Sequence, residues 1–299
     1  MSEQKKYFIW GMGLLGASLA IDLKRANHKV FGCVRSEKNL NTLKEMGFED
    51  CWQTADNSLW EAVKISDGII IGTPIDSMYS ILEMMKKKGV PEHIWITDMA
   101  STKADIMNWV ENTGEKYLFV GSHPMAGSDL GGPEHGRENL FQNATIFVTP
   151  SEKLAAMFPE NIYENTVSEI TAFWKNLNAL PYTVAFAVHD KWAAYLSHGL
   201  HLASCLVSHL IRDIPEVFDV PSNPSGGSFR DITRVAGSNP QLWEGIIQSN
   251  REEVIQYMRS LESLARTWRQ SMEKDALPIA EIFEKSNEIR KKIIKSDKK

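Results

Sequence analysis

The chain has 299 residues, of which 43% are hydrophobic, and its 33 Lys and Arg against 38 Asp and Glu give a formal net charge of −5. A chain of this size and composition usually folds into about two globular domains and is not disordered. The mild acidity argues against nucleic acid as the main partner, and no apolar run reaches the roughly 20 residues that a membrane span needs. We therefore expect the protein to bind neither nucleic acid nor a membrane.

Short apolar runs alternate with helical patterns through the first part of the chain. The runs are nearly continuous, which is typical of strands buried on both faces of a parallel sheet. Amphipathic helices between successive strands complete the units of such a sheet. The predicted strands, all placed in one sheet, are YFIW (7–10), KVFGCV (29–34), DGIIIGTP (67–74), HIWITDM (93–99), YLFVG (117–121), ATIFVTP (144–150) and PYTVAF (181–186).

The pattern changes after the last predicted strand. The segment HDKWAAYLSHGLHLASCLVSHLIRD (189–213) shows long helical periodicity, and Asn239 and Pro240 are typical of the cap and first turn of a further helix. We therefore predict an α/β fold, with a Rossmann-type doubly wound parallel sheet over residues 1–187 and an all-helical domain over residues 188–299. The helical domain has more apolar positions than a small bundle needs, so we expect a homodimer through it; alternatively, these residues fill its own core and the interdomain face.

The cysteines and the first residues bear on location. Cys33, Cys51 and Cys205 are scattered and lack C-x-x-C spacing, which is typical of reduced thiols. The apolar stretch near the start breaks at Gly11, before it reaches the roughly 7–15 residues of a secretory signal. We therefore expect a cytoplasmic protein.

A G-x-G-x-x-G motif follows the first predicted strand directly and opens a helix. Its residues are Gly11, Met12, Gly13, Leu14, Leu15 and Gly16. The first glycine permits a tight turn, the second lets the backbone approach a pyrophosphate, and the third lets the helix pack closely on the strand. Amide groups at the helix N-terminus then favour the phosphates. The motif predicts a dinucleotide site, to which we add Thr73 and Pro74 at a neighbouring strand end; the alternative is a purely structural glycine turn.

The end of the second predicted strand bears on the choice between NAD and NADP. NAD-binding chains usually carry Asp or Glu about 20 residues past the motif, on the ribose 2′-hydroxyl. Here the strand runs into Val34-Arg35-Ser36, and Glu37 comes late. Arg35 can pair with a 2′-phosphate and Ser36 can donate a hydrogen bond to it. We predict NADP as the cofactor, with NAD as the alternative if Arg35 is only a solvated surface residue.

Candidate catalytic residues lie at predicted strand ends and in the helical part. In GSHPMAGSD, His123 follows an apolar run and is flanked by residues that interrupt a strand ladder. Ligands bind at strand ends in α/β proteins, and histidine is the commonest base near neutral pH; the alternative is a turn histidine bonded to a nearby carbonyl. Ser101 ends a different strand and can hold the imidazole by a hydrogen bond. His198 and His201 lie three apart on one helix face, and Arg234 lies in a polar segment.

Five segments together resemble the prephenate/arogenate dehydrogenase family of tyrosine biosynthesis, in family order and with family-like spacing. They are GMGLLGASLA (11–20), TDMASTK (97–103), GSHPMAGSDLGG (121–132), HDKWAAYLSHGLH (189–201) and FRDITRVAGSNPQLW (229–243). The resemblance implies that His123 is the catalytic base and that Ser101 touches both His123 and the substrate. It also implies that Arg234 binds a substrate carboxylate and that His201 acts on the pyruvyl side chain.

The chain departs from the family pattern at two places. The family segment often reads S-H-L-P-H, whereas this chain has Ser197-His198-Gly199-Leu200-His201. Asp129 stands where many members have Glu. The absence of the proline leaves the position of His201 open, and the carboxylate at Asp129 is one methylene shorter.

The resemblance implies oxidative decarboxylation of prephenate to 4-hydroxyphenylpyruvate, with hydride transfer to NAD(P). Arogenate dehydrogenase, which forms tyrosine, is the alternative within the family. A 3-hydroxyacid-type dehydrogenase would need a lysine base, but Lys175 and Lys191 lie on polar helix faces, and a non-catalytic NADP-binding protein would not need Ser101, His123 and Arg234 together. We expect no metal, because no carboxylate set joins the histidines of the helical part.

Overall fold

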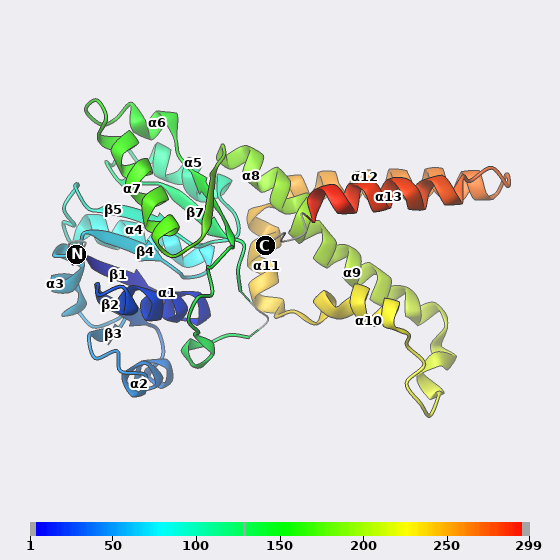
Figure 1. Cartoon of the computed structure of the whole chain (residues 1–299), viewed down its shortest axis with the longest axis horizontal. Coiled ribbons are helices and arrows are strands. Elements are labelled where there is room, and N and C mark those ends of the chain that lie inside the picture. The colour runs from blue at the N-terminus through cyan, green and yellow to red at the C-terminus, as the bar shows by residue number, and fades with distance from the viewer. Residues whose placement is uncertain (1–3, 128–129, 295–299) are drawn as a thin grey trace. The chain divides into compact units, whose positions relative to one another are not determined.

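The computed structural model describes residues 4–127 and 130–294 (Figure 1). Asp129, where the sequence departs from the family, lies outside the described residues. The chain divides into two compact units, Met1–Val254 and Ile255–Lys299. Within the described residues, no helix is both long and apolar enough to cross a membrane.

A six-stranded parallel sheet forms the centre of the first unit, with the strand order β3-β2-β1-β4-β5-β6. This is the doubly wound Rossmann order, so the predicted fold class is confirmed. The strands are β1 (Lys6–Trp10), β2 (Lys29–Val34), β3 (Cys51–Gln53), β4 (Gly68–Ile71), β5 (Trp95–Asp98) and β6 (Leu118–Phe119). The connecting helices are α1 (Leu14–Arg25), α2 (Glu37–Glu45), α3 (Leu59–Lys64), α4 (Ile75–Lys87) and α5 (Ala104–Asn112).

The central strands are apolar because both of their faces are covered. Phe8, Ile9, Ile69 and Ile70 are all fully buried, so successive side chains on opposite faces of β1 and β4 are equally shielded from water. This explains the near-continuous apolar runs in the sequence. The short strand β3 did not stand out in the sequence, because three residues are too few to show a pattern.

A second, three-stranded sheet contains β7 (Gly121–Pro124), β8 (Thr145–Thr149) and β9 (Leu180–Thr183), and the helices α6 (Glu152–Ala155) and α7 (Ile162–Asn176) lie between its last two strands in the chain. β7 pairs with β8 in antiparallel and β8 with β9 in parallel orientation. The prediction that the runs at 144–150 and 181–186 join the large parallel sheet is therefore wrong. An apolar run shows that a strand is buried, but it does not show which neighbour the strand pairs with.

Hydrogen bonds connect the two sheets at Ser122, next to Gly121. Asp98, at the end of β5, accepts a hydrogen bond from the backbone of Ser122, with 3.0 Å between Oδ1 and N. The hydroxyls of Thr97 and Ser122 lie 2.8 Å apart, and Trp174 Nε1 donates to Ser122 Oγ at 3.0 Å. These bonds fix β7, and with it the next residue, His123.

Helices follow the last strand of the second sheet. In the first unit these are α8 (Phe186–Ala193), a π-helical turn (Ala194–His198), α9 (Gly199–Leu210), α10 (Gly227–Thr233) and α11 (Pro240–Ser249), with short 3₁₀ turns at Ile211–Asp213, Pro215–Asp219 and Arg234–Gly237. Asn239 caps α11 as predicted, accepting from Leu242 N at 3.0 Å. α12 (Arg251–Met272) runs into the second unit, which also contains α13 (Ile279–Ile293). The domain boundary after residue 187 stays a prediction.

Candidate active site

The glycine motif forms the turn between β1 and α1. Gly11 has φ of +93°, which favours glycine, and its amide donates to Cys33 O at 3.0 Å. A Cβ on Gly16 would lie 2.4 Å from Gly11 O, so the third glycine lets the helix pack on the turn. A Cβ on Gly13 would meet nothing within 4 Å. The second glycine therefore borders open space, as a backbone that approaches a pyrophosphate must.

The rest of the turn is compatible with phosphate binding. α1 carries no side-chain cap and no acidic residue in its first turn, to which Leu14 and Leu15 belong. Thr73 follows β4 with its Cγ2 against Gly11, and its buried Oγ1 has no hydrogen-bond partner among the described residues. Pro74 precedes α4 as its N-cap residue. Met12 is fully buried, with its Sδ 3.5 Å from Cys51 Sγ, so only its backbone can face a cofactor.

Arg35 and Ser36 lie directly after β2, where the sequence places the ribose of a dinucleotide. Arg35 is exposed. Ser36 caps α2, and its Oγ accepts from Asn39 N at 3.2 Å. A hydroxyl that accepts a hydrogen bond keeps its own proton to donate. Glu37 lies in the first turn of α2, beyond the strand tip.

His123 is the third residue of β7, paired with Phe147 of β8, rather than the last residue before a turn. Its Nδ1 lies 2.8 Å from His189 Nε2, and His189 Nδ1 lies 2.7 Å from Asp190 Oδ1. His189 and Asp190 belong to α8 and are almost fully buried. In the sequence, His189 was weighed only as one of the histidines of the helical part that a metal would need, and Asp190 was given no role. The adjacent His-Asp pair near the start of the helical part was the available signal.

The surroundings keep His123 uncharged. Burial above all, and then the nearby His189, Lys103 and His198, hold the pKa of His123 well below its usual range. Lys103 is itself fully buried and forms an ion pair with Asp98. A neutral imidazole is the form that can accept a proton.

Ser101 lies half-buried in the connection from β5 to α5. Among the described residues it makes no hydrogen bond to His123; the imidazole is held by His189 instead. The prediction that Ser101 orients the histidine is therefore not met in this structure, while a contact between Ser101 and substrate stays a prediction.

His198 and His201 both contact Trp243. The rings of His198 and Trp243 meet edge to face, with their centroids 6.0 Å apart. The ring of His201 stacks on Trp243, with their centroids 3.5 Å apart. Burial lowers the pKa of His198 to about 4, and its Nδ1 accepts from Asn250 Nδ2 at 3.0 Å. His201 Nδ1 donates to Ser197 O at 3.0 Å. The spacing of three thus brings both histidines to one face, as predicted.

Arg234 is exposed and begins the 3₁₀ turn that follows α10. The preceding helix is attached to α9 by a hydrogen bond of 2.7 Å from Ser204 Oγ to Ile232 O. Arg234 therefore lies in the helical region that also carries His198 and His201. Within the described residues, no group of three or more His, Cys, Asp or Glu is arranged to hold a metal ion.

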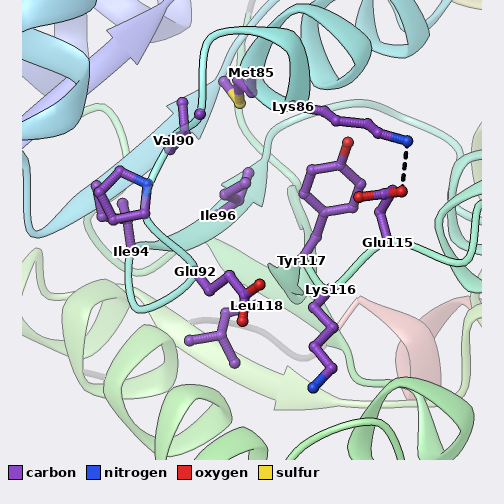
Figure 2. A pocket seen from close by; sticks show the side chains of 12 residues that line it. Met85, Lys86, Val90, Glu92, Ile94, Ile96, Glu115, Lys116, Tyr117 and Leu118 are labelled. Atoms are coloured by element: carbon purple, nitrogen blue, oxygen red, sulfur yellow. Dashed lines mark ion pairs between the residues drawn. The ribbon is translucent and has the colours of Figure 1, made fainter.

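A cavity of about 210 Å³ lies elsewhere, at the amino ends of β5 and β6. Figure 2 shows the ion pair between Lys86 and Glu115 at its edge and the ring of Tyr117 on its wall. The Tyr117 hydroxyl donates to Leu82 O at 3.0 Å. Ligands bind at the carboxyl ends of strands in open α/β sheets, and none of the predicted site residues lines this cavity, so we do not assign it to the active site.

Comparison with known proteins gives two family matches. Residues 19–179 match the nucleotide-binding domain of prephenate dehydrogenase, and residues 186–285 match its dimerization domain. A prephenate dehydrogenase of Bacillus subtilis is 29% identical over 82% of this chain and 64% of its own length. The chain therefore spans less than two thirds of that relative.

Solved structures share the fold. A prephenate dehydrogenase from Aquifex aeolicus, in complex with hydroxyphenyl propionate and NAD+, is 23% identical and superposes with a TM-score of 0.84, covering 98% of this chain and 99% of that one. An arogenate dehydrogenase from Synechocystis is 25% identical with a TM-score of 0.79, covering 97% and 100%. The two family matches together extend over most of the sequence, and the chain belongs to the prephenate dehydrogenase family.

Proposed function

We propose that this protein is a prephenate dehydrogenase that converts prephenate to 4-hydroxyphenylpyruvate and CO₂, with His123 as the proton acceptor. The observation that carries the proposal is the buried His123, kept neutral by its surroundings and held at Nδ1 by His189. The relatives named prephenate dehydrogenase support the choice of substrate.

The chemistry needs a base next to the ring hydroxyl of the substrate. A bound NAD(P)⁺ supplies the acceptor for the hydride that leaves the ring carbon bearing this hydroxyl. His123 takes the hydroxyl proton, so the oxygen becomes a carbonyl. The bond to the ring carboxylate then breaks, CO₂ leaves, and its electron pair makes the ring aromatic. The resulting phenolate oxygen takes a proton back from His123, so the step releases no net proton.

The helical residues are proposed to bind the two substrate carboxylates and the side chain. Arg234 suits a carboxylate, because a guanidinium offers two parallel donors. His201, whose Nδ1 donates to Ser197 O, is proposed to contact the pyruvyl group. His198 contributes a neutral, buried ring beside it. Ser101 completes the site from the end of β5 as a contact to substrate.

We propose NADP as the preferred cofactor and NAD as the second. The exposed Arg35 and the Ser36 hydroxyl are available to a 2′-phosphate, and no carboxylate occupies the strand tip. The turn at Gly13, which borders open space, and the Thr73 hydroxyl, which has no hydrogen-bond partner among the described residues, are proposed to bind the pyrophosphate.

We further propose a cytoplasmic homodimer that associates through residues 188–299. The match of residues 186–285 to a dimerization domain supports this arrangement. Large apolar side chains of the first unit that a partner would cover include Leu210, 65% exposed, and Phe218, 69% exposed.

Initial rates of NADPH and NADH formation with prephenate and with arogenate, run in parallel, test the function. We expect the highest kcat/KM with prephenate and NADP⁺. His123→Asn should lower kcat by roughly 10²–10⁴ and leave cofactor affinity unchanged. The Synechocystis likeness makes arogenate the second candidate substrate; a tenfold preference for arogenate would replace the proposal, and near-normal turnover of His123→Asn would remove His123 from the mechanism.

A further inference from the structure

We propose that Asp190 and His189 are positioning residues that fix the tautomer of His123, so that its Nε2 carries the lone pair that accepts the substrate proton. The inference rests on the proposed role of His123 as base. It assigns a function to the two α8 residues that the sequence did not connect with catalysis.

The direction of the hydrogen bonds follows from Asp190. A carboxylate can only accept, so His189 Nδ1, 2.7 Å from Asp190 Oδ1, is the donor. A neutral imidazole has one N–H group, which leaves His189 Nε2 as an acceptor. His123 Nδ1, 2.8 Å from that atom, must then donate. The remaining ring nitrogen of His123, Nε2, is left with its lone pair.

Asp190 is held as a carboxylate by the N-terminus of α5. Its Oδ1 accepts from Lys103 N at 2.8 Å and its Oδ2 from Ala104 N at 2.7 Å. These amides would otherwise lack partners, and the positive end of the helix dipole favours the negative charge. The carboxylate therefore has two backbone donors besides His189, and these contacts support a neutral imidazole at His189.

Packing allows His189 one orientation. The ring is fully buried and lies edge to face against Phe147 at 5.2 Å and against His123 at 5.0 Å. Asn250 Nδ2 donates to Asp190 O at 2.8 Å and so fixes this part of α8. A histidine that cannot rotate transmits the donor–acceptor direction set by Asp190 to His123.

The arrangement also stabilises the product of proton transfer. When His123 Nε2 takes the proton, the positive ring is bonded through His189 to a buried negative charge. A reversed tautomer would place a proton on His123 Nε2 and block this step. The same logic explains why an aspartate behind a catalytic histidine is worth several orders of magnitude in other enzymes.

Asp190→Asn is the direct test. With its amide nitrogen in the place of Oδ1, the new side chain loses the bond from Lys103 N and donates to His189 Nδ1, which reverses the proton positions in both rings. We expect kcat with prephenate to fall by roughly 10²–10⁴ while KM and the Kd for NADP⁺ change less than threefold. ¹⁵N NMR of the histidine rings, with His123 assigned from His123→Asn, should show Nδ1 protonated in the parent protein and Nε2 protonated in Asp190→Asn.

A second pair of variants leaves the contact of Asp190 with α5 intact. His189→Gln keeps an oxygen that can accept from His123 Nδ1, whereas His189→Leu offers none. We expect His189→Gln to retain at least tenfold more kcat than His189→Leu at similar thermal stability. This comparison holds even if Asp190→Asn fails to fold.

The inference is overturned if the parent protein carries the His123 proton on Nε2, if the ring signals show His189 doubly protonated, or if His189→Leu keeps normal kcat. These outcomes are distinct from a failure of the proposed function. If the parent protein does not oxidise prephenate, the ring tautomers and their reversal in Asp190→Asn remain measurable.

Discussion

Because His198 is buried, we expect the protein to lose stability as the pH falls through about 6.5. Burial lowers the pKa of His198 from 6.5 to about 4. Between these values the unfolded chain binds a proton that the folded chain excludes. The free energy of unfolding therefore has its full value above pH 6.5 and declines as the pH falls below it. One pH unit in this range corresponds to about 1.4 kcal/mol. A shift from pH 7.5 to 5.5 should therefore remove about 1 kcal/mol of unfolding free energy through this residue.

Urea unfolding at pH 7.5 and 5.5, at one fixed protein concentration, measures this effect. His198→Asn keeps an acceptor for the Asn250 amide and does not titrate in this range. The parent protein should lose about 1 kcal/mol more than the variant between the two pH values. The exposed His93→Asn is the matched control and should behave as the parent does. Equal losses in the parent protein and His198→Asn would refute the reasoning, because His198 would then be protonated or hydrated in the folded state.

Gly13→Ala should leave thermal unfolding nearly unchanged but weaken NADP⁺ at least tenfold in fluorescence titration, because its Cβ meets only the space next to the turn; unaltered affinity would contradict the proposed pyrophosphate position. Gly16→Ala should instead lower the unfolding free energy by about 1–3 kcal/mol, because its Cβ overlaps Gly11 O, and a denaturation curve equal to the parent's would disprove this. Arg35→Ala should raise the KM for NADP⁺ about tenfold and leave NAD⁺ unaffected; if NAD⁺ is already the better cofactor of the parent protein, the interpretation of Arg35 is wrong. His201→Ala should raise the KM for prephenate more than it lowers kcat, and it should narrow the preference of the enzyme for prephenate over arogenate. Unchanged kinetics would remove His201 from substrate selection.

Local signals in the sequence were sufficient for the glycine turn between β1 and α1. Gly11 and Gly16 have separate steric reasons, set by neighbours within a few residues or by an adjacent strand end, whereas Gly13 borders open space. The cap of α11 at Asn239 was equally local. Such features can be predicted because the residue type alone decides whether the backbone conformation or the hydrogen bond is available.

The support of His123 could not be predicted in the same way. Its partner His189 lies 66 residues further along the chain, and the two meet beside Phe147 of β8, the strand with which β7 pairs outside the parallel sheet. Apolar periodicity carries no information about that pairing. Ser101 was favoured because it ends a strand, but residues from α8 occupy the position behind the imidazole. Ser36 combines two roles, since the hydroxyl that is predicted to donate to a 2′-phosphate also caps α2.

The measurement that tests the central claim most directly is the absorbance change of NADP⁺ reduction with prephenate, for the parent protein and His123→Asn side by side. The account predicts that the parent protein forms NADPH and releases one CO₂ for each NADPH, and that the variant, with unchanged NADP⁺ affinity, turns over at least a hundredfold more slowly. Reduction without CO₂ release, or equal rates for the two proteins, would contradict it.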